Sequence, residues 1–281
     1  MRVAALQMDS GRDVAANVEA ATSLLARALE AGATYVQMPE YFNYLGSTGG
    51  LAEAAEPVPG PTTRHFGALA RAARATIHLG SIPEVAASGK FHNTSVVIGP
   101  GGDVVATYRK AHLFDVQVAG EVASRESDAV EAGTEMVLVS LEEARVGLSI
   151  CFDVRFPELY RRLATAGAQV LAIPAAFSAA TGRVHWDVLV RARAIENHAF
   201  VVAAAQAGAR GTFPTYGHSL IVDPWGQVLA EGPAEGEAVL VADLNLGEVA
   251  RRRDQIAVLE LARPHLYTSE VRVLDTSSDF R

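Results

Sequence analysis

The segment Arg145-Val-Gly-Leu-Ser-Ile-Cys-Phe-Asp-Val-Arg-Phe-Pro157 decides how we expect this chain to fold. Residues 145–150 form a short, mostly apolar run, which is typical of a strand buried inside a sheet. Pro157 suits the first turn of a helix, where a backbone N–H is not needed. The segment therefore predicts a strand, a sharp corner at Cys151 and a helix over about 156–167.

The same alternation of strands and helices runs through both halves of the chain. In the first half we expect strands at 2–8, 34–38 and 77–83, helices at 14–31 and 62–75, and a hairpin of 94–98 with 104–107. In the second half we expect strands at 145–150, 169–173 and 199–206, helices at 156–167 and 184–197, and a hairpin of 219–222 with 227–230. Two similar halves predict an α/β fold with two facing sheets and helices outside, a four-layer αββα sandwich.

The composition is that of a globular protein, with 49% apolar and 20% charged residues. A net charge of -8 and only short basic clusters argue against nucleic acid as a partner. No run of 18 or more apolar residues occurs, and the chain begins with a predicted strand rather than a targeting segment. We therefore expect a cytoplasmic protein with no membrane partner.

Cys151 is the only cysteine, so the chain has a free thiol and no internal disulfide. A corner between a strand and a helix can direct a side chain and backbone N–H groups to one spot, as a nucleophile and its oxyanion require. Taken alone, however, an unpaired cysteine is more often a small core residue.

A thiol nucleophile needs a base, and the sequence leaves two options open. None of the eight histidines stands at a comparable corner, so a Cys-His pair is only an alternative: His65, His78, His92, His112, His185, His198, His218 and His265. Glu40 follows the strand at 34–38, where α/β sheets place ligand-binding groups. Lys110 follows the strand at 104–107, and an enclosed ammonium could stabilise an oxyanion. For both Glu40 and Lys110, the competing interpretation is an ordinary surface residue exposed to solvent.

Other chemistries lack their motifs. There is no GxGxxG after a strand, no GxxxxGK[ST], no HExxH and no paired CxxC. The sequence thus offers no support for a metal or a nucleotide cofactor.

Three blocks carry a resemblance to a known family: Met38-Pro-Glu40, Tyr108-Arg-Lys-Ala-His-Leu-Phe-Asp115 and Ser149-Ile-Cys-Phe-Asp-Val-Arg-Phe-Pro-Glu158. In this order and spacing they resemble the nitrilase superfamily, the carbon-nitrogen hydrolases with a Glu-Lys-Cys triad. The resemblance implies the αββα sandwich, one domain over 1–267, and homodimers or larger homo-oligomers joined across helices. Residues 268–281 would be a C-terminal tail at the oligomer interface.

The resemblance also implies roles for individual residues. Glu40 would be the general base, Cys151 the nucleophile, and Lys110 with the Phe152 backbone N–H would hold the oxyanion. Glu126 matches a second glutamate of the family and would orient Lys110 or the incoming water. The reaction needs an amide and water but no metal or organic cofactor.

Within the family, Ala176-Phe-Ser-Ala-Ala-Thr-Gly182 and Arg191-Ala-Arg-Ala-Ile-Glu-Asn197 look most like the omega-amidases and deaminated glutathione amidases. The resemblance favours deaminated glutathione, with an omega-amidase acting on 2-oxoglutaramate or 2-oxosuccinamate as the alternative. Phe152, Arg155, Phe177 and Thr181 are the expected substrate-binding residues. Arg155 could bind a substrate carboxylate or pair with Glu158. A catalytically inactive interaction module is the alternative from a different class.

Overall fold

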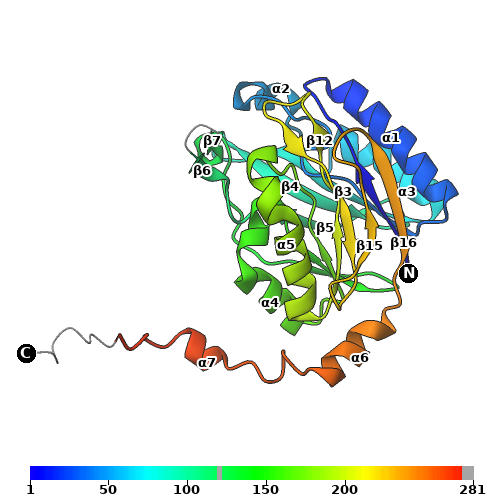
Figure 1. Cartoon of the computed structure of the whole chain (residues 1–281). Coiled ribbons are helices and arrows are strands. Elements are labelled where there is room, and N and C mark those ends of the chain that lie inside the picture. The colour runs from blue at the N-terminus through cyan, green and yellow to red at the C-terminus, as the bar shows by residue number, and fades with distance from the viewer. Residues whose placement is uncertain (119–121, 274–281) are drawn as a thin grey trace, which may run out of the picture.

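The structure is a computed structural model that describes residues 1–118 and 122–273, and two facing sheets form its centre (Figure 1). The strands of the first sheet are β1 (Arg2–Gln7), β2 (Tyr35–Gln37), β3 (Thr76–Val85), β4 (Phe91–Ile98), β5 (Val104–Arg109) and β16 (Ala238–Asp243). Their order is β16-β1-β2-β3-β4-β5. The strands of the second sheet are β8 (Leu138–Ser140), β9 (Arg145–Leu148), β10 (Val170–Ala172), β11 (Phe200–Ala203), β14 (Leu220–Val222) and β15 (Val228–Glu231). Their order is β15-β14-β11-β10-β9-β8.

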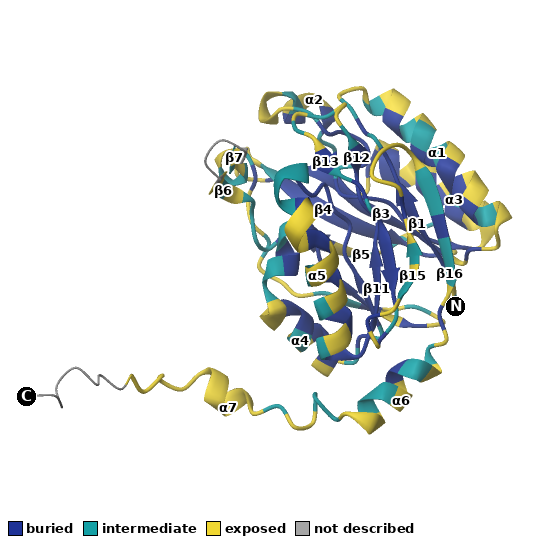
Figure 2. Ribbon diagram, viewed as in Figure 1, coloured by how far each residue is buried: buried dark blue, intermediate teal, exposed yellow. Residues whose placement is uncertain are grey.

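Helices cover the outer faces of both sheets and complete the predicted four-layer αββα sandwich. α1 (Val14–Glu30) and α3 (Pro61–Ala73) pack on the first sheet, and α4 (Pro157–Thr165) and α5 (Ala179–Asn197) pack on the second. The Asp13 side chain caps the start of α1 by accepting a hydrogen bond from the Ala16 N–H. In Figure 2 the central strands of the sheets are buried and the edge strands β15 and β16 only partly so, whereas α1 is exposed on its outer side. The fold class predicted from the sequence is confirmed.

The shorter elements lie around one end of the sandwich. They are α2 (Leu51–Ala54), the hairpin of β6 (Asp115–Val118) with β7 (Val122–Arg125), the hairpin of β12 (Ala207–Gly208) with β13 (Thr215–Tyr216), and three 3-10 turns, η1 (Thr48–Gly50), η2 (Glu126–Asp128) and η3 (Cys151–Arg155). None of the helices in the described residues is long and apolar enough to cross a membrane.

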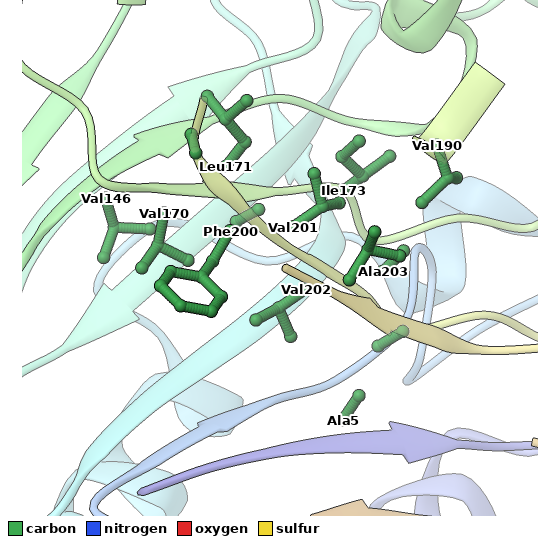
Figure 3. Packing of buried hydrophobic residues seen from close by; sticks show 14 of the residues in the cluster. Ala5, Val146, Val170, Leu171, Ile173, Val190, Phe200, Val201, Val202 and Ala203 are labelled. Atoms are coloured by element: carbon green, nitrogen blue, oxygen red, sulfur yellow. The ribbon is translucent and has the colours of Figure 1, made fainter. Parts of the chain in front are cut away.

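The main core lies between the two sheets and under the helices of the second. Ala5 on β1 belongs to the same buried cluster as Val146, Val170 and Val202 on the second sheet (Figure 3). Burying one such branched side chain completely stabilises the fold by about 1.5–3 kcal/mol. The Gln37 side chain spans this core and donates to the Val202 carbonyl at 3.0 Å, so its buried amide is satisfied.

Several parts of the fold differ from the sequence prediction, among them the start of α5 and the sheet strands β8 and β16. α5 begins at Ala179 rather than 184, because Ser178 caps it and Gly182 packs against the Tyr216 ring, where a Cβ would lie only 2.4 Å from a ring carbon. The glycine at this position permits the close packing. β16 was not predicted at all, although it pairs antiparallel with β1 over the full length of both strands.

The last part of the chain leaves the body of the sandwich as an extended arm (Figures 1 and 2). It contains α6 (Gly247–Gln255) and α7 (Pro264–Tyr267). Leu261 is 76% exposed and Val271 86% exposed on this arm. Of the predicted tail 268–281, residues 274–281 lie outside the described residues.

Candidate active site

Cys151 stands at the corner between β9 and α4, as predicted. It begins η3 with a φ of 46°, in the left-handed region that non-glycine residues rarely adopt. Its backbone N–H donates to the Pro174 carbonyl at 2.9 Å. Such a conformation costs on the order of 1–3 kcal/mol and persists only where the surroundings enforce it. The Cys151 N–H is thus already used, whereas the Phe152 N–H forms no hydrogen bond within residues 1–118 and 122–273.

Asp153 fixes this corner to the other sheet. Its buried carboxylate accepts hydrogen bonds from the Ile150 N–H at 2.8 Å and the Tyr108 hydroxyl at 2.7 Å. It also accepts from the backbone N–H and Nδ1 of His112, at 3.1 and 2.7 Å. Sequence analysis missed Asp153, although a carboxylate beside the cysteine in an otherwise apolar segment was a usable signal. The effect is to hold the end of β5 against the cysteine corner.

Lys110 lies directly after β5 and is almost completely buried between two glutamates. Its Nζ is 2.9 Å from Glu40 Oε1 and 2.9 Å from Glu126 Oε2. Burial by itself lowers the pKa of Lys110, but the Glu126 and Glu40 carboxylates outweigh burial and raise the pKa well above its usual value. Lys110 therefore remains a cation.

Both glutamates receive further hydrogen bonds. The Ala176 N–H donates to Glu40 Oε2 at 2.8 Å, and the Phe114 N–H donates to Glu126 Oε2 at 2.7 Å. The Asn93 side chain donates to Glu40 Oε1 at 2.9 Å and to Glu126 Oε1 at 3.2 Å. Sequence analysis missed Asn93, whose signal was a polar side chain within a buried strand.

The thiol of Cys151 is buried beside this charged group. Burial raises its pKa well above the usual value, and the Glu40 carboxylate raises it further, while Lys110 acts in the opposite direction. The thiol is therefore protonated at neutral pH and requires a base before it can attack.

These residues meet in a pocket of about 470 Å³. The pocket brings together most of the predicted site residues: Glu40, Lys110, Glu126, Cys151, Phe152, Phe177 and Thr181. Tyr41 and Tyr44 also line it. The volume suits a small molecule rather than a macromolecule.

Arg155 is not a lining residue of the pocket among the described residues, but it lies close to two side chains that are. Its guanidinium carbon is 5.8 Å from the Phe152 ring centroid and 5.2 Å from the Phe177 ring centroid. Burial lowers its pKa. No ion pair joins Arg155 to Glu158 in the described part of the chain, so the structural alternative has no geometric support.

No histidine lines this pocket in the described residues. His112 is held by Asp153 and stacks on Phe156, and His218 pairs with Glu231. His78 is buried in the first sheet, where desolvation lowers its pKa to about 3. The geometry therefore favours a carboxylate base over a Cys-His pair. Within the described residues, no group of three or more His, Cys, Asp or Glu side chains is placed to hold a metal.

Comparisons with known proteins agree with this geometry. Residues 2–254 match the family described as Carbon-nitrogen hydrolase. The omega-amidase NIT2 of Mus musculus is 38% identical over 270 residues, which cover 96% of this chain and 97% of that protein. The deaminated glutathione amidase of Synechocystis sp. is 40% identical over 262 residues, which cover 92% of this chain and 96% of that protein.

A solved structure of the Nesterenkonia sp. AN1 amidase, a member of the nitrilase superfamily, is also similar. It aligns with a TM-score of 0.80 and 26% identity and covers 95% of each chain. In that structure, of a mutant, the acetamide moiety of fluoroacetamide is covalently added at the active site cysteine. The chain described here belongs to the carbon-nitrogen hydrolase family of the nitrilase superfamily and is a hydrolase of carbon-nitrogen bonds other than peptide bonds.

Proposed function

We propose that Cys151, Glu40 and Lys110 form the catalytic triad of an amidase that releases ammonia from a small linear amide bearing a carboxylate. The observation that carries the proposal is their meeting in one pocket, with the Lys110 ammonium 2.9 Å from Glu40 Oε1 and the buried thiol beside them. A buried thiol with a raised pKa needs a proton acceptor, and Glu40 is the adjacent carboxylate that acts on it.

The reaction then proceeds in two steps. Glu40 accepts the thiol proton while the Cys151 sulfur attacks the amide carbon. The oxyanion is stabilised by the Lys110 ammonium and the Phe152 N–H. Glu40 returns its proton to the leaving nitrogen, so that ammonia departs and a thioester remains. Glu40 next takes a proton from water, whose oxygen attacks the thioester and releases the acid and the thiol.

The two glutamates differ in how many donors they already have. A carboxylate has about four acceptor sites. Glu126 receives four protein donors, from Lys110, Phe114, Asn93 and Tyr41. Within the described residues, Glu40 receives three, from Lys110, Asn93 and Ala176. Glu40 thus keeps one site for a proton, which supports it as the base, and Glu126 acts by orienting Lys110.

Arg155 gives this site its preference for an anionic substrate. Its guanidinium lies against the Phe152 and Phe177 rings, which a ligand in the pocket would contact. His185 Nδ1, at 3.3 Å, is its hydrogen-bond partner in the described residues. A cation without an acidic partner favours a carboxylate, which it can bind in a bidentate manner. Thr181, on the first turn of α5, would contribute a hydroxyl to the same substrate.

The first substrate we propose is deaminated glutathione, in a metabolite-repair role, and the second is an omega-amide such as 2-oxoglutaramate. Each has a named relative at 38–40% identity. The test is ammonia release from both compounds, a neutral amide and one nitrile, by wild type and Cys151→Ala. We expect release from the carboxylate-bearing amides by wild type alone. Equal rates for wild type and Cys151→Ala would exclude the proposal.

We also propose that the enzyme is a homodimer. Val184 is 67% exposed and Val188 63% exposed on α5, and the C-terminal arm carries further exposed apolar side chains away from its own body. A second copy of this chain would cover both. Light scattering should give a dimer for the full chain and a monomer after Val188→Asp or truncation at residue 255. A monomeric full chain would contradict the proposal.

We further propose that the enzyme works in the cytoplasm, where the free thiol of Cys151 stays reduced.

A further inference from the structure

Asn93 lies between the two carboxylates of the site. It is fully buried on β4, and its Nδ2 is 2.9 Å from Glu40 Oε1 and 3.2 Å from Glu126 Oε1. A side-chain amide has two N–H donors, so each carboxylate receives one. The backbone carbonyl of Asn93 accepts from the Lys110 N–H at 2.9 Å. One residue thus contacts every charged member of the group.

The orientation of the Asn93 amide follows from the charge of its neighbours. Ionised carboxylates only accept hydrogen bonds, so the reversed amide would place an oxygen against two others. Asn93 Oδ1 is buried and has no hydrogen-bond donor in the described part of the chain. Leaving a buried oxygen unsatisfied is destabilising. The Asn93 side chain therefore leaves its Oδ1 without a hydrogen bond and directs both of its N–H donors to the carboxylates.

Without this amide, Lys110 would be the only side chain in the described residues that donates to both Glu40 and Glu126. The two carboxylates would repel each other at close range, and only Lys110 and the Ala176 N–H would hold Glu40 in place beside Cys151. Proton transfer requires the base within hydrogen-bond reach of the thiol, so a small displacement of Glu40 would slow the reaction.

We propose that Asn93 is a positioning residue that fixes Glu40 toward Cys151 and keeps Glu40 and Glu126 apart. This inference rests on the proposed function, in which Glu40 is the base. The charged or titratable groups that face the two carboxylates are Lys110, Cys151 and Tyr41.

The test compares Asn93→Ala and Asn93→Asp with wild type in ammonia release across pH. For Asn93→Ala we expect kcat to fall on the order of 100-fold, as for a misplaced catalytic group, with little change in KM. Hydrogen bonds to a carboxylate favour its ionised form, so removing one raises its pKa. The acidic limb of kcat/KM should therefore move to higher pH.

Asn93→Asp separates positioning from packing because aspartate has nearly the same shape as asparagine. A donor role predicts that Asn93→Asp loses more activity than Asn93→Ala, since it adds a third carboxylate. A packing role predicts the reverse order and would overturn the proposal. If Asn93→Asp does not fold, as judged by thermal unfolding, Asn93→Ala decides: unchanged kcat and an unshifted acidic limb would overturn it.

The matched control is Asn197→Ala, which removes another fully buried amide. Asn197 donates to the Arg193 carbonyl at 3.0 Å and, at 3.5 Å, to Glu196, a carboxylate that does not line the pocket among the described residues. We expect Asn197→Ala to leave the acidic limb in place. Cys151→Ala is measured in the same assay. If it keeps activity, the proposed function itself fails. If it is inactive while Asn93→Ala equals wild type, the positioning role alone fails.

Discussion

The two halves of the sandwich have similar architecture but contribute different chemistry to the pocket. The first half, together with the segment after β7, supplies the charged side chains, with Glu40 after β2, Lys110 after β5 and Glu126 in η2. The second half supplies the thiol, at a residue with positive φ, and the Ala176 and Phe152 N–H groups. Activation of the nucleophile therefore depends on how the two sheets are held against each other.

The two halves also differ in the source of the unfavourable free energy that each contains. The charges of the first half are buried, and the one ammonium of Lys110 compensates in part for the two carboxylates of Glu40 and Glu126. The corner of the second half is strained, and its geometry is held by hydrogen bonds to Pro174 and Asp153. Substitutions in the first half should thus act through electrostatics, and those in the second half through geometry.

The largest expected effect on stability is that of Lys110→Met. It leaves two buried carboxylates without their cation, which should cost about 3–5 kcal/mol of unfolding free energy. The loss of an oxyanion donor should lower kcat by about 10²- to 10³-fold. The chain contains one other lysine, Lys90, which is exposed, and Lys90→Met should change the stability by less than about 0.5 kcal/mol. Urea unfolding measures the unfolding free energy, and ammonia release measures kcat.

The contribution of Lys110 to stability should also depend on pH in one direction. Its folded-state pKa lies above the unfolded value of about 10.4. The contribution is therefore complete below that pH and is lost as the pH rises through the folded-state pKa. The stability difference between wild type and Lys110→Met should be constant from neutral pH to about pH 9 and shrink in stronger alkali. A difference that grows with alkali would contradict the assignment of Lys110 as a buried cation.

Asp153→Ala should have the next largest effect. It removes the acceptor of four hydrogen bonds that join the cysteine corner to Tyr108 and His112. We expect a loss of about 3 kcal/mol in unfolding free energy and a lower kcat, since hydrogen bonds to a charged group are worth about 1.5–3 kcal/mol each and do not add fully. Asp254→Ala, on the exposed side of α6, is the control. If Asp153→Ala has the unfolding free energy of wild type, the turn at Cys151 keeps its conformation without Asp153 and the prediction is wrong.

Arg155→Met should have the smallest effect. We expect it to change only the KM for amides that bear a carboxylate. Loss of a hydrogen-bonded ion pair of about 1.5–3 kcal/mol corresponds to a rise in KM of roughly 10- to 100-fold for carboxylate-bearing amides. A neutral amide of the same length should be cleaved as by wild type. Arg155→Lys should not restore the KM, because lysine lacks the planar fork. An equal rise for the neutral amide would point to a packing role for Arg155.

Much of the fold could be predicted because its elements are locally encoded. The strand before Cys151 and the helix after Pro157 carry their own patterns, and the match between the two halves indicates two sheets. β16 carries a local signal that was missed, since Ala238–Asp243 contains an apolar run with two valines, which is typical of a strand. Its pairing could not be predicted in the same way, because its partner β1 lies more than 200 residues earlier in the sequence.

The candidate site divides in the same way. Glu40, Lys110 and Cys151 follow predicted strands, which made each a candidate, and the family resemblance implied that they form one site. Asn93 could not be inferred, because its importance lies in two hydrogen bonds to residues 53 and 33 positions away. The contact of Arg155 with the Phe152 and Phe177 rings likewise appears only when two separate segments pack together.

The most direct test of the account is the Glu40→Gln variant, followed by two measurements on the same sample. Ammonia release should fall by about 10²- to 10⁴-fold, the usual contribution of a general base. Alkylation of Cys151 by iodoacetamide should persist. It should also reach half its maximal rate at a lower pH than in wild type, because the Glu40 charge that raises the thiol pKa is gone while Lys110 remains.

These two results together would show that Glu40 transfers protons during amide cleavage and that the thiol itself is intact. Ammonia release at the wild-type rate would contradict the account, since another group would then be the base. An alkylation profile displaced to higher pH would contradict the proposed charge balance between the two halves.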